Sequence, residues 1–593
     1  MAALLLLMAL SFVPIAAVAL DWQQRANCRS APLIVSPTGK TGFTLLTNHH
    51  HGVTFTNQLS LEHAELNNNF LNGAGVAAGD FDGDGWCDLY FCNLDGTNAL
   101  YRNLGNWQFE DVTAISGTAC PGQASTGAVF ADINGDGRLD LLVCSCGGPV
   151  TCFLNGGNGH FTNITAASGL IGGFGATSMT LADIDGNGTL DLYVANYAKL
   201  ALLRSAGVLP IRYVNGRPVA TGPGAERLRM VDGQLVELGE PDFLYLNDGQ
   251  GHFSPVSWTN GAFLDESGQP LKEPPPDMGL SAMFRDLNGD GAPDLYVCND
   301  FQGPDRIWIN DGKGHFRALP KLAMRCSSRF SMCVDFADIN RDGLDDFIVA
   351  DMLSRSHLLR TTQMGVADPD RRWPGRYDDR PQIRRNTLFL NRGDGSYSEI
   401  ANYARVEASD WTWCIAFMDV DLDGYEDLLM AGGHTFDIQD HDTMERIRSL
   451  GRPRSAQEAR DRLTLFPPLH TPNYAFRNQG DLTFAETGAA WGFNSTQVGQ
   501  SMVLADLDND GDLDVVINGL NGPPLLYRND SGRPRIAVRL KGIPPNTEGI
   551  GARIKVTGFG LPQSQPIQAG GRYLGSDQPQ RVFAAGSTTN ELT

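Results

Sequence analysis

Short apolar segments alternate with tight polar turns over most of the chain. Segments such as Val76-Ala-Ala-Gly79 and Ser281-Ala-Met-Phe284 precede acidic turns, and runs such as Leu89-Tyr-Phe91 and Val515-Val-Ile517 follow them. Short β-branched or aromatic runs bounded by turn residues are typical of β-strands. The pattern therefore predicts an all-β protein built from many short strands.

The acidic turns are seven copies of one nine-residue segment, which we call the acidic loops. Each has Asp at position one, Asp or Asn at positions three and five, Gly at position six and Asp at position nine. An EF-hand would need flanking helices and a Glu at position twelve, so these loops are predicted to be hairpin turns. The copies are residues 80–88, 132–140, 183–191, 286–294, 338–346, 419–427 and 506–514.

A second motif follows each acidic loop, as in Phe243-Leu-Tyr-Leu-Asn247 and Thr387-Leu-Phe-Leu-Asn391, and in most copies a Gly-rich turn and a fourth strand come next. Four short strands repeated seven times predict a seven-bladed β-propeller, because one such sheet cannot bury both of its faces alone. The predicted propeller covers residues 43–531. Gly52-Val-Thr-Phe-Thr56 is expected to supply a fourth strand to the last blade.

Carboxylates at alternate positions of a tight loop can converge on one hard cation, and calcium prefers six to eight oxygen ligands. Side chains at positions one, three, five and nine are predicted ligands, with the backbone carbonyl at position seven. Up to seven calcium ions are therefore predicted. The predicted ligands are Asp80, Asp82, Asp84, Trp86, Asp88, Asp132, Asn134, Asp136, Arg138, Asp140, Asp183, Asp185, Asn187, Thr189, Asp191, Asp286, Asn288, Asp290, Ala292, Asp294, Asp338, Asn340, Asp342, Leu344, Asp346, Asp419, Asp421, Asp423, Tyr425, Asp427, Asp506, Asp508, Asp510, Asp512 and Asp514.

The net charge of −22 fits this interpretation, because the four side-chain positions of the seven loops hold 24 carboxylates and four Asn. The four Asn are expected to weaken their loops. An acidic chain also lacks the basic footprint that nucleic-acid binding needs. Two plainer explanations stay open: Asp and Gly favour turns without any ion, and bound ions can stiffen hairpins without any catalytic or signalling part.

The loops and the Phe-Leu-Asn strands together resemble FG-GAP or VCBS repeats, the blades of integrin α-subunit propellers. Farther on, Asn546-Thr-Glu-Gly-Ile-Gly-Ala-Arg-Ile-Lys-Val556 and Gln568-Ala-Gly-Gly-Arg-Tyr-Leu-Gly-Ser576 resemble the ASPIC and UnbV module of the cartilage acidic protein family. The resemblance implies a small β module over residues 532–593. This module is expected to be incomplete, because the family pattern continues beyond the motifs found here.

The first residues favour export. Residues 1–19 are apolar and end in the small-residue site Ala17-Val18-Ala19, which is typical of a signal peptide, although no Lys or Arg precedes the apolar run and an uncleaved anchor is the alternative. A secreted, extracellular or periplasmic location follows.

Of the eleven cysteines, five fill recurring small-residue positions and are expected to be buried thiols, namely Cys92, Cys144, Cys298, Cys333 and Cys414. Some disulfide pairing is expected among the other six.

Function is expected where the repeats differ. Insertions at about 197–241, 352–385 and 433–472 all precede the Phe-Leu-Asn strand, so they should share the face opposite the acidic loops. A polar rim is expected there from Asn93, Ser145, Asn196, Asn299, Asp351, Gly432 and Gly519.

The leading hypothesis is a calcium-stabilised module that binds an extracellular protein or glycan. The alternative is a polysaccharide lyase or hydrolase on the same face, with His434, Asp437, Asp440, His441 and Asp442 as a possible acid/base or metal group.

Overall fold

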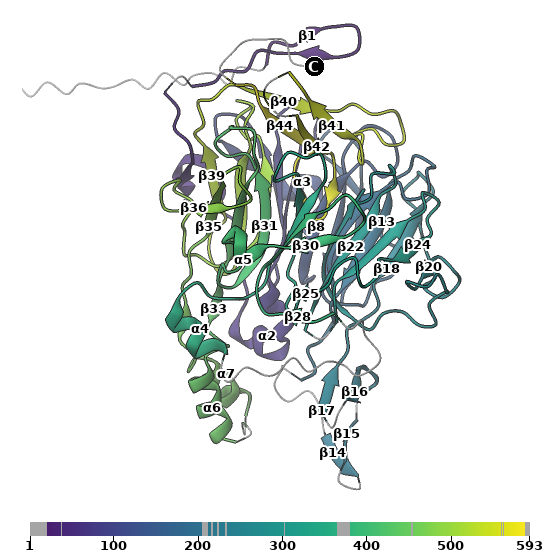
Figure 1. The fold of residues 1–593 in the computed structure, drawn as a ribbon, viewed down its shortest axis with the longest axis vertical. Coiled ribbons are helices and arrows are strands. Elements are labelled where there is room, and N and C mark those ends of the chain that lie inside the picture. Colours follow the sequence, from purple (N-terminus) through teal and green to yellow (C-terminus); the bar gives the residue numbers. More distant parts are fainter. Residues whose placement is uncertain are drawn as a thin grey trace, which may run out of the picture.

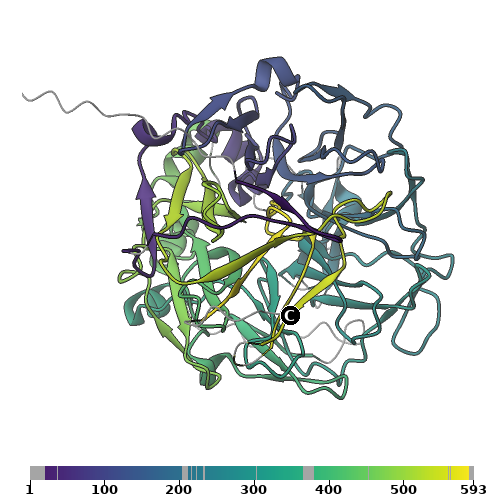
Figure 2. The same cartoon turned by 90° about the horizontal axis from the view of Figure 1, so that it is seen from above.

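The structure is a computed structural model that describes residues 20–586 except 37, 204–210, 215–216, 222–223, 232–233, 302, 365–379, 452, 454, 559 and 561. The predicted signal peptide lies outside the described residues. Seven antiparallel sheets stand around one axis and form a seven-bladed β-propeller, which confirms the predicted fold (Figure 2). Within the described residues, no helix is long and apolar enough to cross a membrane.

Each blade has four strands in sequence order, and the hairpin between its first two strands carries an acidic loop. Gly79 pairs with Asp88 across the first acidic loop, and Ala131 pairs with Asp140 across the second. The acidic loops are therefore hairpin turns, as predicted. Blades 1 to 3 comprise β4 (Val76–Gly79), β5 (Asp88–Phe91), β6 (Ala99–Asn103) and β7 (Phe109–Asp111); β8 (Ser125–Ala131), β9 (Asp140–Ser145), β10 (Thr151–Asn155) and β11 (Phe161–Asn163); and β12 (Ala176–Ala182), β13 (Asp191–Asn196), β18 (Phe243–Asn247) and β19 (Phe253–Pro255).

The same arrangement continues through blades 4 to 6. In blade 4 a short extra strand, β20 (Phe263–Leu264), runs parallel to the fourth strand. The strands are β21 (Met278–Arg285), β22 (Asp294–Asp300), β23 (Arg306–Asn310) and β24 (Phe316–Ala318); β26 (Val334–Ala337), β27 (Asp346–Val349), β29 (Thr387–Asn391) and β30 (Tyr397–Glu399); and β31 (Thr412–Met418), β32 (Asp427–Gly432), β35 (Tyr474–Asn478) and β36 (Phe484–Glu486).

The seventh blade is closed by the N-terminal part of the chain. It comprises β37 (Gly499–Ala505), β38 (Asp514–Gly519), β39 (Leu525–Asn529) and β3 (Phe43–Leu46), and Phe43 pairs with Asn529. Closure by an N-terminal strand was predicted, but the predicted position at Gly52–Thr56 was wrong. Those residues form no strand; they follow the short helix α1 (Asn48–His51), and Val53 and Phe55 pack their side chains against blades 1 and 7.

The first strand of each blade lies nearest the axis and is fully buried. Each first strand contacts the first strand of the next blade, and β37 contacts β4, so the ring is complete. These strands carry small residues at one recurring position. A Cβ atom on Gly75 would lie 1.8 Å from the carbonyl oxygen of Leu574, so this position is small because another segment approaches it closely.

That segment belongs to residues 532–586, which lie across the acidic-loop face of the propeller (Figure 1). Their strands are β40 (Arg535–Arg539), β41 (Arg553–Val556), β42 (Gln563–Pro566), β43 (Ala569–Gly570) and β44 (Gln580–Ala584). Residues 569–578, which we call the axial loop, enter the centre of the ring, and β43 pairs with β12. The axial loop also contacts first strands of other blades, through Ala128 N–H to Leu574 O (3.2 Å), Ala78 N–H to Ser576 O (2.9 Å), Leu504 N–H to Asp577 Oδ1 (2.9 Å) and the stacked rings of Trp413 and Tyr573.

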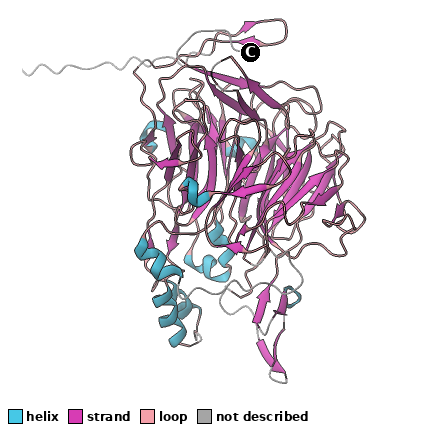
Figure 3. Cartoon of the chain, viewed as in Figure 1, coloured by secondary structure: helices cyan, strands magenta, loops and turns pink. Residues whose placement is uncertain are grey.

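The opposite face carries the insertions and a second axial element. Figures 1 and 3 show helices α4, α6 and α7 and the small hairpins gathered there. Helix α2 (Leu61–Leu66) and the 3₁₀ helix η1 (Asn68–Asn72) cover the axis. The insertions contain β14 (Ile211–Val214), β15 (Arg217–Ala220), η2 (Ala225–Arg227), β16 (Leu228–Val231) and β17 (Gln234–Glu237); α4 (His357–Met364) and β28 (Gln382–Ile383); and β33 (His434–Phe436), α6 (His441–Ser449), α7 (Ala456–Leu463) and β34 (Pro468–Leu469).

A few short elements lie at the edges of the propeller. They are β1 (Gln23–Gln24), β2 (Arg29–Ser30), α3 (Thr113–Ser116) and α5 (Ala401–Ala404), whereas the buried strand β25 (Ser327–Ser328) pairs with β28 of the second insertion. All eleven cysteines are free thiols. The five predicted buried thiols are buried, and the expected disulfide pairing among the other six is absent. Of those six, Cys87, Cys120 and Cys152 are buried, Cys146 and Cys326 are partly exposed, and Cys28 is exposed.

Candidate metal centres

The first Asp of an acidic loop holds the turn together through its carboxylate. In the first loop, Asp80 Oδ1 accepts the Gly83 N–H and Asp80 Oδ2 accepts the Gly85 N–H, both over 2.9 Å. Gly85 has a φ of 93°, a left-handed conformation that glycine adopts without strain. The bend at position six therefore points backbone N–H groups at position one and curls the loop around it.

The ninth Asp links the loop to the third strand of its own blade. Asp88 Oδ2 accepts the Phe81 N–H (3.1 Å) and Asp88 Oδ1 accepts the Asn103 N–H (2.8 Å). The same pair of bonds recurs at all seven ninth positions, for example at Asp140 and Asp514. Because these carboxylates are buried, position nine is held in one orientation before any ion binds.

The Asn that ends each Phe-Leu-Asn strand ties neighbouring blades together, a role that the sequence did not reveal. The side-chain amide of Asn103 donates to the carbonyl of Cys87 in its own loop and to the carbonyl of Leu507 in the seventh loop. Equivalent bonds run from Asn155 to Phe81 and from Asn247 to Ile133. The sequence did contain a signal for this role. Asn occupies the same strand position in all seven blades, and such a repeat indicates that each Asn makes the same contact.

Four acidic loops bring three carboxylates close enough to hold one ion. In each group the oxygens of positions one, three and nine lie within 4.8 Å of one another. The other three loops have Asn at position three, so they contribute one amide oxygen and one charge fewer to the same geometry. The four groups are Asp80, Asp82 and Asp88; Asp183, Asp185 and Asp191; Asp419, Asp421 and Asp427; and Asp506, Asp508 and Asp514.

The donor set in these groups suits a hard cation. All donors are oxygens, and Oδ1 of Asp421 and Oδ1 of Asp506 are buried without a hydrogen-bond donor among the described residues. A buried carboxylate oxygen without a partner carries a large desolvation cost. A cation that accepts six to eight oxygen ligands would remove that cost, so the residues present fit calcium.

Positions five and seven form hydrogen bonds to each other within the loop. Asp84 Oδ1 accepts the Trp86 N–H (3.0 Å), and Asp423 Oδ1 accepts the Tyr425 N–H (3.0 Å). These bonds define the second half of the loop. The ligand roles of positions five and seven stay predictions.

The crowding of carboxylates changes their acidity. The pKa of Asp140, Asp191 and Asp294 is raised to about 7 and that of Asp346 to about 8, chiefly by burial. Backbone N–H groups act in the opposite direction, and neighbouring loop carboxylates add to the rise. The pKa of Asp88 is also raised well above its ordinary value, again chiefly by burial. Without a cation, the loops therefore resist full ionisation at neutral pH.

Arginines from the third strand of the blade lie against the first and sixth acidic loops, which the sequence analysis did not anticipate. Arg102 pairs with Asp82 (2.6 Å) and Asp84 (2.8 Å), and Arg477 pairs with Asp421 (2.7 Å) and Asp423 (2.8 Å). Both arginines directly precede the Asn of the Phe-Leu-Asn strand, and this position was the signal that could have found them. The guanidinium groups balance part of the charge at positions three and five.

The acid/base group expected in the third insertion does not converge on one point. His434 is buried, its ring stacks on Trp411 with centroids 4.5 Å apart, and its Nδ1 lies 2.7 Å from the Phe436 carbonyl oxygen. Burial lowers the pKa of His434 to about 4. Asp440 caps helix α6 by accepting the Thr443 N–H (2.8 Å), and His441 and Asp442 begin that helix. Asp437 accepts a hydrogen bond from Gln363 (3.0 Å).

The expected polar rim is also corrected. Asn93, Asn196, Asn299 and Asp351 are buried rather than exposed. The N–H of Asn299, for example, donates to Asp305 Oδ1 (3.0 Å), so strand ends at this position are tied into their own blades. These side chains satisfy buried backbone groups and leave the insertions themselves as the exposed part of this face.

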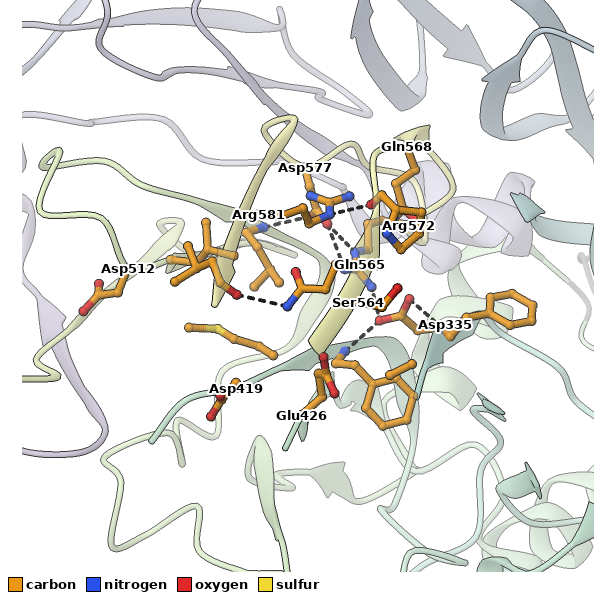
Figure 4. A pocket seen from close by; sticks show the side chains of 18 of the residues that line it. Asp335, Asp419, Glu426, Asp512, Ser564, Gln565, Gln568, Arg572, Asp577 and Arg581 are labelled. Atoms are coloured by element: carbon orange, nitrogen blue, oxygen red, sulfur yellow. Dashed lines mark hydrogen bonds and ion pairs between the residues drawn. The ribbon is translucent and has the colours of Figure 1, made fainter. Parts of the chain in front are cut away.

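A cavity of about 60 Å³ lies between residues 564–582 and blades 4 to 7 (Figure 4). Arg572 enters its wall from the axial loop and pairs with Asp335 and with Asp577 (2.8 Å). Arg581 donates to the carbonyl oxygens of Pro566 (2.7 Å) and Gln580 (2.8 Å). The cavity is therefore lined by groups that already bind one another and hold residues 532–586 on the propeller.

Comparison with known proteins accounts for the repeated loop and strand pattern. The model of the FG-GAP-like repeat matches residues 80–143, 132–194, 286–349, 377–430 and 466–517. This chain carries FG-GAP-like repeats. It is also a distant homologue of cartilage acidic protein 1, with 25% identity to the Mus musculus protein over 361 residues (50% of this chain and 51% of the relative) and 27% identity to the Homo sapiens protein over 355 residues (50% of each). The chain spans about half the length of these curated relatives.

Solved structures give weaker similarities. An Agrocybe aegerita lectin described as recognising non-reducing terminal N-acetylglucosamine has a TM-score of 0.37 and 16% identity, with 77% of this chain and 94% of that chain covered. YCF48 bound to a D1 peptide also has a TM-score of 0.37, with 8% identity over 88% of this chain and 100% of that chain. At these scores neither protein bears on the function of this FG-GAP-repeat chain.

Proposed function

We propose that this protein is an exported calcium-binding propeller that recognises a protein or glycan through the face that carries the three insertions. Calcium has a structural part in this proposal: up to seven ions neutralise the acidic loops and hold the blades together. The export rests on the apolar segment 1–19 and its small-residue cleavage site.

The observation that carries the proposal is the separation of the two faces. Residues 532–586 cover the acidic-loop face and fill the axis; for example, Arg553 pairs with Asp345, position eight of the fifth loop, over 2.5 Å. The insertions project from the opposite face (Figure 1). Repeat architectures place variable segments on the face that binds partners, because variation there leaves the stacked core unchanged.

The calcium part is supported by the four carboxylate groups and their buried, unpartnered oxygens. The FG-GAP-like repeats place these groups at equivalent turns of the blades. Because each ninth Asp is fixed by two backbone N–H groups, an ion at this position would connect the first, second and third strands of a blade.

The test is binding to a glycan and protein array, with calcium and again with chelator. The full chain is compared with a variant in which the three insertions are replaced by a short turn such as Asn93–Asn98 of blade 1. We expect binding that the variant loses while it keeps one cooperative unfolding transition. Equal binding by the variant would overturn the choice of face, and a melting temperature unchanged by chelator would overturn the structural part of calcium.

A further inference from the structure

The insertion face has a different charge from the rest of the chain. The three insertions, 197–241, 352–385 and 433–472, hold 20 Lys and Arg against 14 Asp and Glu, whereas the remaining residues hold 26 against 54. The insertions therefore carry a net charge of +6 in a chain of −22. The described residues of the insertions hold 14 Lys and Arg against nine Asp and Glu. Because they project from one end of the propeller, opposite the acidic loops (Figure 1), the molecule presents a basic face to a partner.

The described part of the second insertion contributes most to this charge. Residues 352–364 and 380–385 hold five Arg and no acidic residue. Arg385 pairs with Glu399 (2.5 Å) and Arg360 pairs with Glu407 (3.4 Å). Arg384 forms no ion pair within the described part of the chain, so its charge is available to a ligand.

Strand pairing places Arg384 beside an aromatic ring. Strand β28 runs parallel to β25, with Ser328 opposite Ile383. Each strand is followed by an arginine, and Arg329 and Arg384 lie over the ring of Phe330 with their Cζ atoms 5.6 and 5.7 Å from its centroid. This arrangement depends on two segments about 55 residues apart in the sequence.

The ring is held in position from behind. Phe330 packs edge-on against Phe301, with centroids 5.6 Å apart and an angle of 88° between the planes. Gln382 donates from Nε2 to the Phe301 and Gly303 carbonyl oxygens, over 3.0 and 3.1 Å. Both rings are partly exposed and partly packed against the main core. The Phe330 site (Phe301, Arg329, Phe330, Gln382 and Arg384) is therefore a fixed aromatic surface flanked by cations.

We propose that the Phe330 site binds a uronic-acid-containing polysaccharide, an inference that rests on the proposed function and specifies its ligand. The C–H edge of a pyranose ring carries partial positive charge and packs on the negative face of an aromatic ring. A guanidinium beside that ring can hold the sugar carboxylate through two parallel N–H bonds. The basic surroundings attract a repeating anion at long range.

An acidic peptide has the matching negative charge but contacts only the arginines of the site and not the aromatic ring. A Glu or Asp carboxylate can pair with Arg384, yet the flexible peptide offers no sugar ring to pack on Phe330. A polyuronate provides a rigid ring and a carboxylate in every residue, so adjacent sugars can meet the ring and an arginine together. The geometry of the site therefore favours the polysaccharide.

The experiment measures binding of the full chain, with calcium present, to polygalacturonate, neutral dextran and poly-L-glutamate by titration calorimetry. The variants are Arg384→Glu, which reverses the unpaired charge, and Phe330→Leu, which removes the ring but keeps an apolar side chain of similar size. The matched control is Arg392→Glu, because Arg392 is an exposed residue in the turn between β29 and β30, at the acidic-loop end of the fifth blade. Melting temperatures are recorded for every variant to confirm folding.

We expect polygalacturonate to bind more tightly than dextran or poly-L-glutamate. Arg384→Glu should weaken this binding about tenfold or more, as expected for loss of one charge-assisted contact, and Arg392→Glu should leave it unchanged. Equal or tighter binding of poly-L-glutamate, equal binding of dextran, or an unaffected Arg384→Glu variant would overturn the inference. If a neutral glycan or a protein on the array then bound the full chain but not the variant without insertions, the proposed function would stand and only the polyuronate ligand would be wrong.

Discussion

The hydroxyl of Tyr573 donates a hydrogen bond to the backbone carbonyl oxygen of Asn72 over 2.8 Å. Asn72 ends η1 on the insertion face, and Tyr573 lies in the axial loop that enters from the acidic-loop face. Two segments about 500 residues apart in the sequence therefore meet inside the ring. The axis of this propeller is filled by its own chain from both ends.

Tyr573→Phe removes this bond and keeps the ring that stacks on Trp413. We expect a loss of about 1 kcal/mol in the free energy of unfolding, because the partly buried Asn72 carbonyl loses its partner. The measurement is urea denaturation with calcium present. Tyr403→Phe is the matched control, since Tyr403 is 63% exposed. An equal loss in both variants would show that the axial bond adds nothing.

Arg572 is the buried cation that holds the axial loop. Its side chain and that of Asp335 are 5% and 4% exposed, and it also pairs with Asp577. We expect Arg572→Met to lower the free energy of unfolding by about 3–5 kcal/mol, because two buried carboxylates lose their partner. Adding Asp335→Asn should restore part of that loss. Guanidinium denaturation of both variants checks this, and a double variant less stable than Arg572→Met would refute the charge argument.

Deleting residues 43–60 removes β3, which pairs with β39 in the seventh blade. We expect the variant to lose a single cooperative unfolding transition, because the last blade then exposes an unpaired strand edge. Scanning calorimetry with calcium present is the measurement. Deletion of residues 20–34, which includes β1 and β2 but none of the blade strands, is the control and should keep one transition.

Chelation should make stability depend on pH. In the ion-free protein the pKa of Asp140, Asp191 and Asp294 is about 7, above the ordinary value near 4 in the unfolded chain. Between these values the native state holds protons that the unfolded state has released, so the free energy of unfolding falls as pH rises from about 4 to 7, by roughly 1.4 kcal/mol per pH unit for each such carboxyl. Above pH 7 it should level off.

The measurement is the melting temperature between pH 5 and 8, in chelator and in excess calcium. Calcium should raise the melting temperature most at pH 7 to 8, where the loops would otherwise carry unbalanced charge. Parallel curves with and without calcium would contradict an ion at the acidic loops.

The free thiols give a test of the fold that is independent of calcium. All eleven cysteines are unpaired, and most are enclosed by the blades. Thiol titration should find eleven reactive groups after denaturation and few before it. A reducing agent should leave the melting temperature unchanged. A denatured protein with nine or fewer thiols would show a disulfide that this structure lacks.

The local pattern of the chain was sufficient to predict the blades. Each acidic loop combines turn chemistry with flanking strand signals, and this information lies within about fifteen residues. Seven copies therefore predicted seven hairpins and a seven-bladed ring, and the position of the insertions before the third strand predicted the face on which they lie. The carboxylate groups at positions one, three and nine follow from the same local spacing.

The errors arose where the deciding contacts are distant in sequence. The strand that closes the seventh blade is Phe43–Leu46 rather than Gly52–Thr56, because pairing with β39 depends on register across nearly the whole chain. Asn93 and Asn299 were expected at an exposed rim, yet both are buried. Asn93 accepts the Gln58 N–H from the segment before blade 1, and Asn299 donates to the Pro304 carbonyl oxygen. Periodicity places such residues along a strand but does not show what covers them.

The sequence by itself determined the number of blades, the acidic loops at one end and the insertions at the other, because short-range turn and strand preferences repeat regularly. Only the tertiary structure decided that residues 569–578 fill the axis and that Arg329 and Arg384 flank Phe330. Each of these arrangements joins segments that are distant in the sequence. Such contacts form only in the folded protein, so no local pattern encodes them.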